Sequence, residues 1–221
     1  MRELGGARHL GANGALMRKS SASGPVALGI RVKTGRAVVV ALRMQNRLAE
    51  VVLRTEISLT DSATPATTQP HHEVMHLPWE RALRTVAPIE RKIRAASTKT
   101  LGGLLGKLSA DGASIGIVGI TGGTVNDPGR IANPHIRAHA AEGRLFREAT
   151  EFAARACKLV AETFAEADVQ AIASRRLGLT PPAIAEHIAA MGRSIKPWRA
   201  DEKLAALVAW MAIESRARGR R

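Results

Sequence analysis

The sequence predicts an α/β protein with one mixed β-sheet, made of a three-strand antiparallel meander plus parallel strands, and with helices on its faces. Three β-rich segments follow one another in residues 26–60, before any helical segment appears. A short apolar segment at residues 113–120 then lies between two helical segments. Strands that alternate with helices are typical of parallel pairing, because a crossover helix returns the chain to the same end of the sheet.

Length and composition indicate one globular domain with basic ends. The chain has 221 residues, of which 45% are hydrophobic and 24% are charged, which is a globular balance. Residues 1–24 are rich in Gly, Ser and Ala without hydrophobic periodicity, so we expect a disordered basic extension there. We expect the domain at residues 25–213 and a basic tail at residues 214–221. Translation could start at Met1 or at Met17.

The net charge of +14 favours a polyanionic partner such as nucleic acid, because contacts with phosphates release condensed counterions. With no Tyr and three Phe, few side chains can stack on bases, which argues against a single-strand binder of the aromatic kind. No apolar run reaches the ~18 residues of a membrane helix. The single cysteine, Cys157, excludes an internal disulfide and fits a reducing compartment. We therefore expect a cytoplasmic protein without membrane contact, and the oligomeric state stays open.

Hydrophobic periodicity and turn residues place the elements. The expected strands are residues 26–32, 37–42, 50–59, 113–120 and 158–162. The expected helices are residues 78–108, 133–156, 165–177, 181–191 and 201–213. In the first helix, Pro88 is expected to kink or restart the helix. The basic residues that gather on the outer side of this helix are Arg81, Arg84, Arg91, Lys92 and Lys99.

The helix expected at residues 133–156 begins with side chains that can perform chemistry. Asn133 is a suitable N-cap and Pro134 a suitable first residue. At ~100° per residue, His135, His139 and Glu142 fall on one face. Two imidazoles and a carboxylate at this spacing could hold a divalent metal, either Zn²⁺ or Mg²⁺/Mn²⁺. One histidine of the preceding loop could approach the same site, and the loop offers His71, His72 and His76.

The same region could instead form a metal-free anion pocket. The pair Gly122–Gly123 follows the apolar strand at its carboxyl end, which is where open α/β sheets bind ligands. Backbone N–H groups of this turn and of the following helix start could hold a phosphate. The candidate anion-binding residues are Lys33, Gly122, Gly123, His135, Arg137 and Arg144.

Two further carboxylates lie near expected element ends. Glu162 closes the strand at residues 158–162. Asp201 begins the last helix and lies at the edge of its apolar stripe, whereas Glu202 is expected to point away from that stripe. The stripe consists of Leu204, Leu207, Val208 and Met211.

This order of elements resembles the ribonuclease H-like fold, nearest to its Holliday-junction resolvase branch. The segments Val160–Glu162 and Arg199–Ala206 look like the places where that branch carries acidic residues. The chain is also similar to an uncharacterised bacterial family of this fold in the phrases around residues 69–72, 135–147 and 197–203. The resemblance implies a mixed sheet and a divalent-metal nuclease site with acidic residues at Glu162 and Asp201. Glu142, which shares a helix face with His135 and His139, could join them, so the candidate catalytic residues are Glu162, Asp201 and Glu142.

The acid set implied by this resemblance is incomplete. Such nucleases carry an aspartate in the first strand, where this chain has Gly29–Lys33, and a second acid where this chain has Thr121–Gly123. Two-metal cleavage of a phosphodiester needs several carboxylates around the ions. The leading hypothesis is therefore a protein that binds nucleic acid or another phosphate-bearing partner. The alternatives are a metal-dependent hydrolase or nuclease, and an interaction subunit that docks a protein partner.

Overall fold

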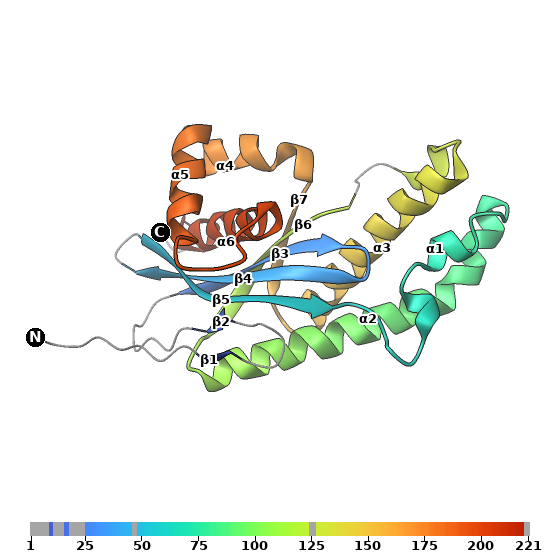
Figure 1. The fold of residues 1–221 in the computed structure, drawn as a ribbon, viewed down its shortest axis with the longest axis horizontal. Helices are drawn as coiled ribbons and strands as arrows, with labels where there is room; N and C mark the ends of the chain where they lie inside the picture. Colours follow the sequence, from blue (N-terminus) through green and yellow to red (C-terminus); the bar gives the residue numbers. More distant parts are fainter. Residues whose placement is uncertain (1–8, 11–15, 18–24, 46–47, 124–126, 219–221) are drawn as a thin grey trace, which may run out of the picture.

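A computed structural model describes residues 9–10, 16–17, 25–45, 48–123 and 127–218 of the chain. In these residues a mixed β-sheet lies between two layers of helices (Figure 1). The strands are β1 (His9–Leu10), β2 (Leu16–Met17), β3 (Val26–Lys33), β4 (Arg36–Gln45), β5 (Leu48–Ser58), β6 (Ile115–Thr121) and β7 (Val160–Phe164). The helices are α1 (Pro70–Glu73), α2 (Trp79–Ala110), α3 (Pro134–Ala156), α4 (Val169–Leu177), α5 (Pro181–Met191) and α6 (Ala200–Arg218). Short 3-10 helices cover Pro65–Thr67, Pro128–Arg130 and Glu166–Asp168.

The strand order in the sheet is β1-β2-β5-β4-β3-β6-β7. Strands β3, β4 and β5 form an antiparallel meander, and β6 and β7 join β3 in parallel. This confirms the predicted mixed sheet. Strand β7 begins later than predicted, at Val160, because Lys158 takes a left-handed turn conformation with φ 60°. Glu162 is therefore in the middle of this strand rather than at its end.

The two ends of the domain differ from the expected boundaries. Strands β1 and β2 lie within the segment that we expected to be disordered, and β2 pairs antiparallel with β5. The other residues of that expectation, 1–8, 11–15 and 18–24, lie outside the described residues. At the other end, helix α6 continues to Arg218 instead of stopping at Ile213, so the backbone at 214–218 extends the helix.

Each face of the sheet has its own core. Helices α2 and α3 cover one face, where Ile30 of β3 packs with Ile93 of α2 and Phe146 of α3 (Figure 1). Helices α4, α5 and α6 cover the other face, where Phe164 of β7 packs with Ile184 of α5. Burying one such side chain stabilises the fold by about 1.5–3 kcal/mol. Side chains therefore alternate along β3 between the α2–α3 face and the α6 face.

Two neighbouring glycines let α6 lie directly on the sheet. Gly29 of β3 and Gly119 of β6 are paired in register. A Cβ atom at Gly29 would lie 1.8 Å from the carbonyl oxygen of Ala205, and one at Gly119 would lie 2.3 Å from that of Val208. Any side chain at either position would therefore push the helix away from the sheet.

Helix α6 is buried on all sides between the sheet and helices α4 and α5. All residues from 205 to 213 are buried, so the prediction of a single apolar stripe is wrong for this helix. A helix that packs on all sides needs an apolar surface all round rather than one stripe. Glu202, which we expected to point away from the core, is 3% exposed.

Helix α2 is continuous from Trp79 to Ala110, although Pro88 lies inside it. The helix is therefore not interrupted at Pro88, where we expected a kink or a restart. Its basic outer face is confirmed, because the basic residues expected there are all exposed. We call this surface the α2 basic face, and it comprises Arg81, Arg84, Arg91, Lys92, Lys99 and Lys107.

Candidate functional site

Charged side chains meet at the carboxyl ends of β3 and β7, next to the start of α6. Arg31 Nη2 of β3 donates a 3.0 Å hydrogen bond to Glu166 Oε1, which follows β7. Arg31 Nε lies 3.6 Å from Asp201 Oδ1, and Lys33 Nζ lies 3.1 Å from Asp201 Oδ2. We call Arg31, Lys33, Glu166 and Asp201 the charged cluster. Its two positive and two negative side chains neutralise one another.

Gly122 makes room for the guanidinium of this cluster. Its φ is 128°, and a Cβ atom there would lie 2.6 Å from Arg31 Nη1. Arg31 Nη1 also donates a 3.0 Å hydrogen bond to the carbonyl of Val32. The Arg31 side chain is only 11% exposed, so it occupies the interior of the cluster rather than its rim.

Glu162 lies on the same face of the sheet but away from the charged cluster. Its carboxylate accepts two hydrogen bonds from Arg176, of 2.6 and 2.7 Å, and one of 3.4 Å from Ser215. The hydrogen bonds that Arg176 donates to Glu162 raise the pKa of Arg176. Asp201 and Ser215 are separated by about 21 Å along α6, at 1.5 Å per residue. The expected proximity of Glu162 and Asp201 is therefore not found.

Glu202 is the other acidic residue at the start of α6, and it is used for packing. Arg54 of β5 donates to its carboxylate through Nε and Nη2, and the backbone N–H of Arg199 donates at 2.9 Å. Burial alone would raise the pKa of Glu202, but the hydrogen bonds from Arg54 and from backbone N–H groups outweigh it and hold this pKa below its usual value. The side chain is a buried carboxylate that is fully engaged with cations and donors.

Glu142 of α3 is on the opposite face of the sheet and is fully buried, with 0% exposure. Its Oε1 atom lies 2.8 Å from His72 Nδ1 and accepts a 3.3 Å hydrogen bond from the backbone N–H of His72. Among the described residues, no hydrogen-bond donor reaches its Oε2 atom. The three candidate catalytic carboxylates, Glu142, Glu162 and Asp201, thus lie at three separate places.

Three histidines meet where α1 packs against the first turns of α3 (Figure 1). The ring centroids of His72 and His139 are 4.3 Å apart, those of His135 and His139 4.5 Å, and those of His72 and His135 5.3 Å. One side-chain nitrogen from each ring lies within 4.8 Å of the others. We call His72, His135 and His139 the histidine cluster. Asn133 caps the helix as predicted, accepting hydrogen bonds from the backbone N–H groups of His135 and Ile136.

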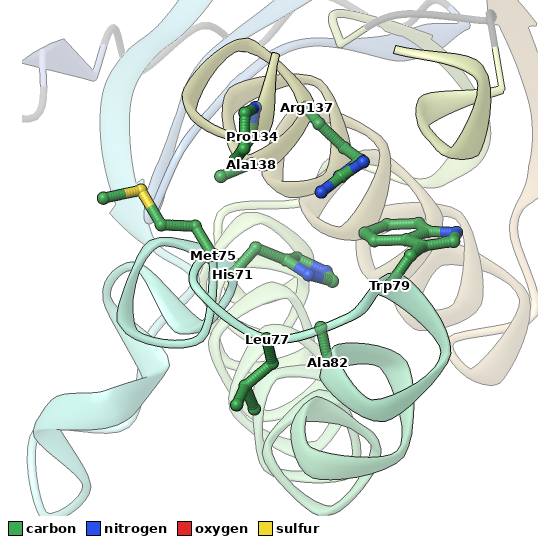
Figure 2. Close-up of a pocket in the computed structure, with 8 residues that line it drawn as sticks. All are labelled: His71, Met75, Leu77, Trp79, Ala82, Pro134, Arg137 and Ala138. Carbon is green, nitrogen blue, oxygen red and sulfur yellow. The ribbon is translucent and has the colours of Figure 1, made fainter. Parts of the chain in front are cut away.

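The neighbouring histidine, His71, anchors α1 instead of joining this cluster. Figure 2 shows His71 and Arg137 pointing toward Trp79 across the junction of α1, α2 and α3. The His71 ring stacks on Trp79 at 5.9 Å, and the Arg137 guanidinium lies 5.6 Å from the same ring. Burial, followed by the charge of nearby His72, lowers the pKa of His71 to about 4. His71 is therefore a neutral packing residue at pH 7.

The candidate anion-binding residues do not converge on one pocket. Arg137 donates to the carbonyl of Ile131 at 3.2 Å, and Arg144 is bound to Glu148 at 2.6 Å. Gly123 has φ 65°, and a Cβ atom there would lie 2.2 Å from the carbonyl oxygen of Gly143 in α3. Lys33 and Gly122 belong to the charged cluster, whereas His135 belongs to the histidine cluster.

The sequence did not predict that Arg31 and Glu166 belong to the charged cluster. It also did not predict the contact between His72 and Glu142. The period-2 alternation of β3 carries a usable signal, since it places Arg31 and Lys33 on one face of the strand. Glu166 lies directly beyond the end of β7 because that strand ends at Phe164, two residues later than expected. Contact between His72 and Glu142 depends on how α1 packs on α3, which local sequence patterns do not report.

A groove runs between strand β5 and helix α2, with a volume of about 750 Å³. Its α2 wall carries three lysines of the α2 basic face, Lys92, Lys99 and Lys107. Small residues, including Ala95 and Gly103, line the wall between them. The groove is therefore positively charged along its α2 wall, while Glu56 and Asp61 also line it.

Comparisons with known proteins identify the fold. No protein-family model and no curated protein matches the chain. Among solved structures, Thermus thermophilus RuvC matches with a TM-score of 0.50 and 11% identity, covering 88% of this chain and 96% of RuvC. RuvC of the same organism in complex with a Holliday junction substrate matches with a TM-score of 0.49 and 12% identity, with the same coverage. A Ppx/GppA family member from Aquifex aeolicus matches with a TM-score of 0.34 and 13% identity, over 78% of this chain and 41% of its own.

The fold is ribonuclease H-like, as the resemblance in the sequence implied. Identities of this size establish the architecture and leave the chemistry to the residues themselves. Within the described part of the chain, no helix combines the length and hydrophobicity that crossing a membrane requires.

Proposed function

We propose that the protein binds nucleic acid, or another phosphate-bearing polymer, through the α2 basic face and the groove beside it. The observation that carries this proposal is the placement of Lys92, Lys99 and Lys107 along one wall of an open groove. From Lys92 to Lys107 the helix rises about 22 Å, the length of about six base pairs at 3.4 Å each. A row of exposed cations on this scale binds a phosphate backbone without requiring base recognition.

The opposing acidic residues of α2 are few. Glu80 is exposed in the first turn, whereas Glu90 is half-buried and its pKa is raised by burial. The net charge of the whole chain, +14, has the same sign as this surface. Such a charge accelerates association with polyanions and makes the affinity depend on salt.

We further propose that the charged cluster does not perform two-metal phosphodiester cleavage. Asp201 lies in a segment where the resemblance predicts a metal-binding acid, but Asp201 and the neighbouring Glu166 bind Arg31 and Lys33. Two metal ions held ≈ 3.5–4 Å apart need an excess of negative charge around them. A neutral cluster with a guanidinium inside it supplies no such excess.

The solved structure of RuvC with a Holliday junction substrate guides the choice of ligand. The likeness concerns the fold, so it supports testing branched DNA first and does not specify the ligand. Duplex and single-stranded oligonucleotides of the same length are the natural comparisons. A partner pull-down that survives nuclease treatment would favour the protein-interaction function instead.

The proposal is tested by measuring fluorescence anisotropy of labelled DNA against salt. We expect binding that weakens steeply between 50 and 200 mM salt, the range over which phosphate contacts lose ~10³–10⁵ in affinity when there are 6–10 of them. The triple variant Lys92→Gln/Lys99→Gln/Lys107→Gln should reduce the slope of log K against log[salt] by up to about 2.7, at about 0.9 per phosphate contact.

The matched control removes three exposed charges from the opposite side of the molecule. The variant Arg193→Gln/Lys196→Gln/Lys203→Gln loses the same net charge from the segment before α6 and its first turn. It should keep most of the slope of the natural chain. Absence of binding at low salt, or an equal loss in both triple variants, would contradict the proposed surface.

A further inference from the structure

We infer that the histidine cluster binds one divalent transition-metal ion, with Zn²⁺ as the best fit, and that Glu142 orients one of the ligands. This inference concerns a different part of the molecule from the α2 basic face. Failure of DNA binding would therefore leave it standing, and failure of metal binding would leave the nucleic-acid proposal standing.

The three rings are already close enough to share an ion. One nitrogen from each of His72, His135 and His139 lies within 4.8 Å of the others. Around a tetrahedral zinc with Zn–N bonds of 2.0–2.1 Å, ligand nitrogens are separated by about 3.4 Å. His135 and His139 are exposed, so their rings are free to rotate toward a shared ion.

The rings meet edge to face, with interplanar angles between 71° and 84°. In this arrangement the nitrogens of different rings can point at one common centre, whereas stacked rings would point theirs in parallel. Two of the ligands come from successive turns of α3, so helix geometry already places them on one face.

Glu142 supplies the independent observation. It is a fully buried carboxylate whose neighbour at ion-pair distance is His72, with 2.8 Å between Oε1 and Nδ1. A buried carboxylate is costly unless positive charge or donors compensate it. When His72 binds a metal through Nε2, its Nδ1–H faces Glu142 and the ion supplies the missing positive charge, as in other carboxylate–histidine–zinc arrangements.

Packing also prepares the position of His72. The adjacent His71 is 3% exposed and stacks on Trp79, which holds α1 against α2. His72 then projects from the other side of α1 toward α3, and the backbone N–H of His72 donates to Glu142. The least mobile ligand is therefore the one that packing and Glu142 orient, while the two exposed ligands adapt to it.

The ligand types select the metal. Imidazole suits Zn²⁺, Cu²⁺, Ni²⁺ and Fe²⁺, whereas Mg²⁺ and Ca²⁺ prefer oxygen ligands. Three protein ligands on an exposed surface leave a fourth position for water or for an oxygen of a bound molecule, as in zinc sites that carry out catalysis. The ligand set differs from the one expected from the sequence, because His72 replaces Glu142 as a ligand. Glu142 instead becomes a positioning residue.

The test uses the tag-free full chain, freed of metal by a chelator that is then removed. Isothermal titration with Zn²⁺ should give one site per chain, and elemental analysis after gel filtration should give the same stoichiometry. Zinc at a concentration of about 100 times Kd should raise Tm by about 5–10 °C for a protein of this size. No zinc retained by the natural chain would overturn the inference.

The variants separate this site from adventitious binding. His139→Ala changes an exposed side chain on a helix, so the fold should be retained, and it should abolish the stoichiometric site. His76→Ala removes an exposed histidine of the same segment that is outside the cluster, and it should bind zinc as the natural chain does. Equal zinc binding by the natural chain and by His139→Ala would also overturn the inference.

Glu142→Gln tests the positioning role. It should weaken zinc affinity by about 10–100-fold, as loss of other outer-shell partners does, while the stoichiometry stays at one. In the Co²⁺-substituted protein the visible absorption bands should keep their tetrahedral form in this variant. Loss of those bands would instead make Glu142 a direct ligand and contradict its assigned role.

Discussion

At the scale of single residues, Arg31 determines what the carboxyl edge of the sheet can bind. Its guanidinium lies between Glu166 and Asp201, at hydrogen-bond distance from the first and 3.6 Å from the second. The resemblance places an aspartate in this part of the first strand, and this chain carries a positive charge there instead. Replacing this positive charge with a negative one should make the cluster attract cations.

We predict that Arg31→Asp creates a weak Mn²⁺ site in the charged cluster, because three carboxylates would then face one lysine. The measurement is Mn²⁺ titration followed by electron paramagnetic resonance, in a His139→Ala background that removes the histidine cluster. Arg36→Asp, an equal charge change at an exposed position at the start of β4, serves as the control. The same Mn²⁺ affinity in both variants would count against this account of the cluster.

A second prediction for a single residue concerns His71 and the pH dependence of folding stability. Its pKa is lowered to about 4 in the folded chain, so the unfolded chain binds more protons below pH 6.5. Stability should therefore rise with pH, and the contribution of His71 should be complete above pH 6.5 and lost as pH falls through about 4. The loss at full protonation is on the order of 3 kcal/mol.

The measurement for His71 is urea unfolding from pH 7 to pH 3.5 in the presence of a chelator. His71→Phe keeps an aromatic ring against Trp79 and cannot be protonated. Its stability should fall less over this range than that of the natural chain. Parallel pH profiles for the two proteins would show that His71 is not buried in its neutral form.

At the scale of elements, helix α6 packs in direct contact with the backbone of the sheet at Gly29 and Gly119. Gly119→Ala places a methyl group 2.3 Å from the carbonyl oxygen of Val208, on a rigid backbone. Overpacking typically costs 1–3 kcal/mol, and against backbone we expect at least about 3 kcal/mol. Thermal or urea unfolding measures this loss.

Gly103→Ala is the matched control for that prediction. Gly103 lies within α2, and an added Cβ atom would meet no atom within 4 Å. In a helix, replacing Gly by Ala stabilises by about 0.5–1 kcal/mol. The two substitutions should therefore have opposite signs, and a small effect of Gly119→Ala would mean that α6 is not seated as described.

The elements also show which features the sequence could predict. The meander and the parallel strands followed from alternation and turn residues, which act locally along the chain. The burial of α6 on all sides was not predicted. An alanine-rich helix can show an apolar stripe in its sequence, but the elements packed around the helix determine which of its residues are buried. The offset of β7 came from the left-handed conformation of Lys158, for which the side chain carries no signal.

For the candidate site, local spacing predicted that His135 and His139 share a face, and the structure brings their rings to 4.5 Å. It could not select His72 from the three histidines of the preceding segment. That choice depends on which of two adjacent residues turns toward Trp79 and which toward Glu142. Helix and strand periodicity do not report such tertiary contacts.

At the scale of the whole molecule, the two faces of the sheet have different charged features. Helices α2 and α6 lie on opposite faces of the sheet (Figure 1). The α2 basic face is on the first side, and the charged cluster is beside the start of α6 on the other. A ligand confined to the groove along α2 would therefore lie on the other face of the sheet from the carboxylates of Glu166 and Asp201. This arrangement supports our proposal that the protein binds its ligand without cleaving it at that cluster.

The measurement that tests this most directly is the salt dependence of affinity for junction DNA, with the integrity of the DNA checked after each titration in Mg²⁺. We predict uncut DNA and a steep salt slope that falls when Lys92, Lys99 and Lys107 are replaced by Gln. Intact affinity in that variant, or cleavage that disappears on Asp201→Asn, would contradict it.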